Sequence, residues 1–150
     1  MDLRDVLLTL HILFAIVIIG WLAMQSMIVP GLIRQGPENA SAVRASAAVS
    51  RKLGPASVVV FLLGIWLALR DGNDAIDMGD PWLSASMGIF IVTAVLGGAV
   101  GGKAEMQAAE KLTAGQPALE EAKRLSLVGT VNMVLLVVIV FLMVDKPGLV

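Results

Sequence analysis

The chain of 150 residues has the length of one domain, yet 57% of its residues are apolar, 15% are charged and its mean hydropathy is +0.87. A net charge of −1 gives no electrostatic case for nucleic acid as a partner, and the lack of cysteine excludes disulfides, thiolate metal sites and iron–sulfur clusters. This composition predicts a single membrane domain over residues 1–150, surrounded by a lipid bilayer.

Four charge-free runs hold most of the apolar residues. They cover residues 6–29, 53–69, 81–102 and 125–144, and each is close to the roughly 20 residues that a helix needs to cross a bilayer core. A soluble bundle is disfavoured, because helices that are apolar all round leave no face for water. The predicted fold is therefore all-α, an antiparallel bundle of four membrane-spanning helices.

The first run is expected to remain as a helix rather than to be removed as a secretory signal. Its leading residues are not basic, it is too long, and no A-x-A site follows. A bend or stop is predicted at Pro30, which lacks an amide hydrogen. The alanine-rich segment 37–52 is predicted to be a cytoplasmic helix that continues into the second run, bent at Pro55.

The third run begins at Asp80–Pro81, an N-cap acid followed by a proline suited to the first helical position. Its end is rich in glycine at a spacing of four, which lets helix backbones approach closely. We therefore predict helix packing at Gly97, Gly98, Gly101 and Gly102.

Beyond the glycines, helical composition continues to Thr113, with Glu105, Glu110 and Lys111 expected on a solvated extension. Residues 114–117 break the helix. Pro117 is predicted to start the fourth helix, whose early charges are expected on a wet cytoplasmic face: Glu120, Glu121, Lys123 and Arg124.

The basic residues predict the orientation. Most of the eleven lie in the connections after the first and third runs, whereas the second connection, residues 70–80, contains Asp71, Asp74, Asp77 and Asp80. By the positive-inside rule the two basic connections are cytoplasmic and both termini are extracytoplasmic.

Polar side chains inside the runs are the candidates for function, because such groups are costly in lipid. His11, the one histidine of the chain, shares a helical stripe with Gln25 and is expected to face the bundle. Gln25 and Asn132 are expected to hydrogen-bond across helices as part of helix packing. The sequence offers no serine, histidine and acid constellation and no pair of buried carboxylates, so an enzymatic activity stays undecided.

A cofactor site is predicted near the outer surface. At 1.5 Å of rise per residue, His11, Met87 and Met143 lie about 7, 10 and 3 Å below it. Imidazole and thioether groups suit haem b or copper. The alternative is that the histidine bonds a neighbouring helix and the methionines fill gaps.

Three short segments carry a family resemblance. They are Leu10–Ile12, Asp80–Leu83 and Phe141–Pro147, in the order and spacing of four spans. The chain resembles uncharacterised four-span bacterial membrane proteins grouped under a domain of unknown function, and is more distantly similar to the CopD copper-resistance family and HemJ-type protoporphyrinogen oxidases. The HemJ resemblance implies a haem role for His11. In that family a lysine-proline pair follows the last span, and the matching position here is Lys146. The resemblance therefore implies a multi-pass protein of the bacterial inner membrane.

Three functions remain open from the sequence. The first is a non-enzymatic accessory or interaction protein, assembled as a homo-oligomer or within a larger membrane complex through its glycine-rich third helix. The second is a haem- or copper-binding redox protein that uses His11. The third is a small transporter, which ranks last because charges inside the runs are lacking.

Overall fold

The computed structural model describes residues 2–70 and 80–145, and within these ranges every regular element is a helix. The elements are α1 (Leu3–Met27), α2 (Val29–Gln35), the 3₁₀ turn η1 (Pro37–Asn39), α3 (Ala40–Arg70), α4 (Pro81–Val95), the π-helical turn η2 (Leu96–Gly101), α5 (Gly102–Thr113) and α6 (Leu119–Asp145). The all-α prediction is confirmed. The acidic residues of 71–79 and Lys146 lie outside the described residues.

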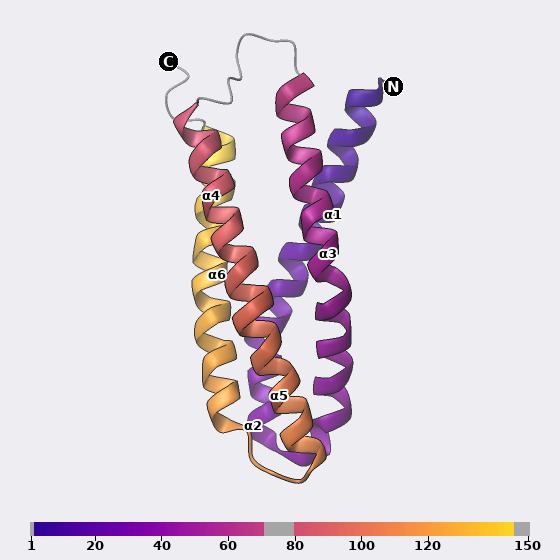
Figure 1. Ribbon diagram of the computed structural model, residues 1–150, viewed down its shortest axis with the longest axis vertical. Coiled ribbons are helices and arrows are strands. Elements are labelled where there is room, and N and C mark those ends of the chain that lie inside the picture. Colours follow the sequence, from indigo (N-terminus) through magenta and orange to yellow (C-terminus); the bar gives the residue numbers. More distant parts are fainter. Residues whose placement is uncertain (1, 71–79, 146–150) are drawn as a thin grey trace.

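The helices join into four rods that are long and apolar enough to cross a membrane. The rods are Leu3–Gln35, Pro37–Leu69, Pro81–Thr113 and Leu119–Asp145, and they contain the four predicted runs. Successive rods alternate in direction (Figure 1). We call the end with the α2–α3 and α5–α6 connections the closed end, and the end where α1 begins and α6 finishes the open end.

Prolines set several of the boundaries. A turn at Ile28 separates α1 from α2, so the predicted break near Pro30 is confirmed. Pro55 lies inside α3, which runs unbroken from the alanine-rich segment into the second apolar run. Gly115 turns the chain after α5 with a φ of 71°. α6 begins at Leu119 rather than at Pro117, with the Ala122 amide donating to the Ala118 carbonyl.

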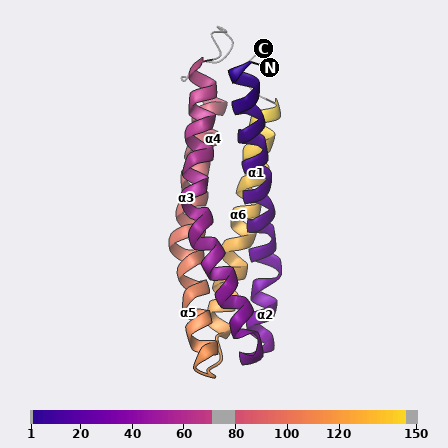
Figure 2. The same ribbon diagram turned by 90° about the vertical axis from the view of Figure 1, so that its right-hand side faces the viewer.

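Packing is tightest at the closed end. α5 contacts both α3 and α6 there, and α2 contacts α6. Figure 2 shows α2 and α5 together at this end of the bundle. Apolar side chains from all these helices form one buried cluster: Val29, Ile33, Val43, Ala108, Ala109, Leu112, Ala118, Ala122 and Leu125. The closed end is therefore the hydrophobic core of the bundle.

Toward the open end the pair α1–α3 diverges from the pair α4–α6 (Figure 1). Phe61 of α3 and Phe90 of α4 stack across this separation, with ring centroids 5.0 Å apart. Large apolar side chains cover the outside of the rods, among them Ile16 at 61% exposure and Val137 at 64%. Such a continuous apolar surface suits acyl chains rather than water.

Glycines permit close contacts with α6. A Cβ built at Gly97 would lie 2.9 Å from the Asn132 amide nitrogen, and one at Gly101 would lie 3.5 Å from a Val128 methyl group. Gly98 faces open space instead. The backbone forms a π-helical turn here, with the Gly102 amide donating to the Gly97 carbonyl, which the spacing of the glycines did not predict.

An ion pair joins α5 to α6 beside their connection. Lys111 Nζ lies 2.6 Å from a carboxylate oxygen of Glu121. Glu121 is buried, so the expectation of a wet face is wrong at this position. Its helix turns the carboxylate toward α5, whereas Glu120 and Lys123 pair with each other in solvent.

Candidate functional site

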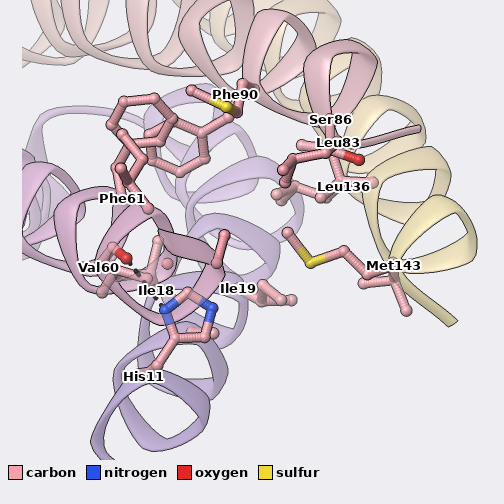
Figure 3. A pocket seen from close by; sticks show the side chains of 17 residues that line it. His11, Ile18, Ile19, Val60, Phe61, Leu83, Ser86, Phe90, Leu136 and Met143 are labelled. Atoms are coloured by element: carbon pink, nitrogen blue, oxygen red, sulfur yellow. Dashed lines mark hydrogen bonds between the residues drawn. The ribbon is translucent and has the colours of Figure 1, made fainter. Parts of the chain in front are cut away.

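His11 points from α1 to α3. Its Nδ1 lies 3.0 Å from the backbone carbonyl oxygen of Val60 (Figure 3). A carbonyl can only accept a hydrogen bond, so Nδ1 carries a proton, and in the neutral ring Nε2 is then the nitrogen with the lone pair. This arrangement fixes the tautomer of a histidine that uses Nε2 as an acceptor or a metal ligand.

The ring fits because α3 has a glycine beside it. A Cβ built at Gly64 would lie 3.0 Å from His11 Cε1. Gly64 is one helical turn beyond Val60, so the residue that leaves room and the carbonyl that accepts the hydrogen bond share one face of α3. The sequence-based prediction did not include Gly64, although its spacing of four residues from Val60 could be read from the sequence.

The predicted cofactor residues line one cavity. It has a volume of about 160 Å³ and is bounded by α1, α3, α4 and α6 between the diverging pairs. His11, Met87 and Met143 all contribute to its wall, with Phe61 and Phe90 closing one side (Figure 3). The structure thus brings the three predicted residues together around one space.

The size of the cavity limits its contents. Its volume is close to that of an engineered apolar cavity of about 150 Å³ that binds benzene. A single metal ion with its ligands, or one small ring, fits this space. The porphyrin of haem b does not fit unless α3 and α4 move apart, so this cavity disagrees with the haem prediction.

A second polar site lies deeper, toward the closed end. Glu105 of α5 is fully buried, and its carboxylate accepts hydrogen bonds from Ser46 and, at 2.8 Å, from Ser50 of α3. Gln25 of α1 donates to the same carboxylate at 2.7 Å. Trp21 donates to the Ser50 hydroxyl at 3.2 Å, which completes a network across three helices.

The expectation that Glu105 lies on a solvated face is therefore wrong. Glu105 shares an inner face of α5 with Ala108, Ala109 and Leu112, all of which are buried. That i, i+3, i+4, i+7 spacing was present in the sequence and was the signal that could have found it. Donors on two neighbouring helices stabilise a carboxylate that burial alone would strongly penalise.

Gln25 and Asn132, both predicted to act in helix packing, are buried. Gln25 bonds across helices through Glu105 and Ser50. Asn132 lies against Gly97, and within the described ranges its Oδ1 accepts no hydrogen bond. Residues 2–70 and 80–145 contain no cluster of three or more histidine, aspartate or glutamate side chains placed to hold a metal ion.

Comparison with known proteins identifies the family of the chain. A family model described as "Predicted integral membrane protein (DUF2269)" covers residues 5–147. No curated protein and no solved structure matches the chain. The distant similarity to the CopD and HemJ families stays a prediction.

Proposed function

The chain belongs to the DUF2269 family of predicted integral membrane proteins, and on that premise we propose that it binds copper(I) in the bacterial inner membrane. The observation that carries the proposal is the His11 ring, whose Nδ1 is occupied by the Val60 carbonyl. Its Nε2 lone pair is then available at a cavity that Met87 and Met143 also line.

The chemistry of this donor set favours copper(I) over harder ions. Thioether sulfur is a soft ligand that selects copper(I), and imidazole nitrogen binds copper as well. Carboxylates, which suit magnesium, calcium and manganese, do not line the described cavity. The apolar wall excludes water, which keeps the ion in a dry, shaped site.

Each residue has a distinct role in the proposed site. His11 supplies nitrogen, and the Val60 carbonyl orients the ring as an outer partner. Met87 on α4 and Met143 on α6 supply sulfur from the opposite side of the separation between the helix pairs. Binding would then join α1–α3 to α4–α6 at the open end.

The test is copper(I) binding by the purified protein in detergent without oxygen. We expect one copper per chain, measured by competition with a chromogenic copper(I) chelator, and a loss of binding in His11→Ala. Met87→Leu and Met143→Leu should each weaken binding. The matched control is Met27→Leu, which changes a methionine that is 80% exposed.

Two results would overturn the copper proposal. One is copper binding that is unchanged in His11→Ala. The other is a Soret band, lost in His11→Ala, in protein purified with haem supplementation; that result would assign haem b to His11 and require the helix pairs to separate.

The accessory role and the transporter role stay predictions. Assembly into a homo-oligomer or a larger membrane complex through the glycines would bring a partner helix to Gly98, which faces open space on an exposed part of the third rod. Gly98→Leu should then change the assembly seen by co-purification or cross-linking, and an unchanged assembly would contradict that role.

A further inference from the structure

A second, larger cavity opens on the side of the bundle toward the closed end. It has a volume of about 630 Å³ and lies between α1, α3 and the segment from α4 to α5. This volume falls within the roughly 300–1,000 Å³ typical of sites for small organic ligands. We call it the basic groove, after its two charged residues, Arg51 and Lys103.

Both cations of the basic groove are without a partner in the described parts of the chain. Arg51 on α3 and Lys103 on α5 are exposed, and no hydrogen bond or salt bridge joins either to residues 2–70 or 80–145. No described aspartate or glutamate lines the groove. The groove is therefore complementary to an anion.

Most of the remaining lining is apolar and suited to an acyl chain. Its polar members hydrogen-bond within the protein: Trp21, Gln25, Ser50 and Ser57. Gly54 and Gly98 line it, and a Cβ built at either would meet nothing within 4 Å. The apolar side chains of Leu22 and Val58 also line it. The small residues leave a slot rather than a filled surface.

The charged and apolar parts follow the direction of the bilayer. Arg51 comes just before the apolar run 53–69, and Lys103 comes directly after the run 81–102. Both cations therefore lie at the membrane surface on the closed-end side. Val58 and Gly98 lie within the runs, nearer the bilayer middle, so the groove is charged at the surface and apolar inside.

We propose that the basic groove binds one anionic phospholipid of the closed-end leaflet, with the phosphate on Arg51 and Lys103 and an acyl chain along Gly98. Basic pockets between membrane helices are known to hold anionic head groups. A free phosphate would use the cations but leave the apolar slot unexplained. The site is separate from the His11 cavity and does not depend on copper binding.

The experiment compares lipids on the full chain in detergent. Dioleoyl phosphatidylglycerol is the anionic probe, dioleoyl phosphatidylcholine the zwitterionic probe, and inorganic phosphate the head-group control. We expect native mass spectrometry to show one retained phosphatidylglycerol per chain, bound in preference to phosphatidylcholine, and no effect of phosphate at matched concentration.

The key variant is the double substitution Arg51→Gln and Lys103→Gln. It should weaken phosphatidylglycerol binding about thirtyfold, because each of the two cations contributes about 1 kcal/mol of attraction to anionic lipid. The control Arg34→Gln with Lys52→Gln removes the same charge from exposed residues outside the groove and should keep the preference. Gly98→Leu should weaken both lipids by filling the slot.

Several outcomes would overturn the lipid assignment. They are equal binding of both lipids, an anionic preference that survives in the double variant but not in the control, and competition by inorganic phosphate alone. Cross-links from groove positions to a second chain would also overturn it, by assigning the groove to a partner helix. Copper binding should be unchanged in the double variant, which separates this test from that of the proposed function.

Discussion

Gly129 of α6 lies against Ser26 of α1 so closely that a Cβ added at Gly129 would come within 2.2 Å of the Ser26 Cβ and 2.8 Å of its Cα. The second distance involves backbone, so the contact cannot be relieved by rotating a side chain. The α1–α6 crossing therefore depends on the absence of a side chain at this position. Along α6, Gly129 lies between the residues of the closed-end core and those that line the His11 cavity.

Gly129→Ala should destabilise the bundle by about 1–3 kcal/mol, the usual cost of overpacking. The added methyl group must push α1 away from α6. Reversible unfolding in mixed micelles measures the free-energy change. The control is Gly88→Ala, where a Cβ meets nothing within 4 Å; equal stabilities of the two variants would contradict the expected clash.

Gly64→Ala should weaken the proposed copper site while the protein stays folded. The new Cβ would lie 3.0 Å from His11 Cε1 and displace a movable ring from the Val60 carbonyl. Loss of such an orienting hydrogen bond typically costs about 10–100-fold in metal affinity. Gly54→Ala, on the same helix with open space, should leave copper binding unchanged. Equal affinities of the two variants would argue against the role of Gly64.

Glu105→Ala should be among the most damaging single changes in the closed half. It removes the acceptor for Ser46, Ser50 and Gln25, and an unsatisfied buried donor costs about 1–3 kcal/mol. Glu105→Gln should cost less because an amide oxygen still accepts. Glu110→Ala, on the exposed side of the same helix, is the control in the same unfolding assay, and a similar loss there would show that the network contributes little.

The Lys111–Glu121 pair should couple more strongly than the Lys123–Glu120 pair. The side chains of the first are 43% and 11% exposed, and those of the second 70% and 76%. Exposed pairs are worth about 0.2–1 kcal/mol because water and salt screen them. We expect a double-mutant cycle to give about 1 kcal/mol for the first pair and less than about 0.5 kcal/mol for the second. Equal couplings would contradict the burial of Glu121.

The sequence by itself determined the helices. Charge-free runs of bilayer length placed the four rods, Pro81 placed the start of the third, and Pro30 indicated the break between α1 and α2. These features act within a few residues of their own position, so they can be seen without knowing the neighbours. His11 stood out for the same reason, as an isolated polar group in an apolar run.

Only the tertiary structure decided which face of each rod meets which partner. The charged helical segment after the third run predicted a solvated Glu105, but α3 and α1 bring three donors to it. Likewise Val60 and Gly64 are ordinary apolar positions in the sequence. They contact the His11 ring because α3 lies against α1 there. Hydropathy records whether a segment prefers lipid, whereas burial and hydrogen bonding depend on residues far along the chain that packing brings within a few ångströms.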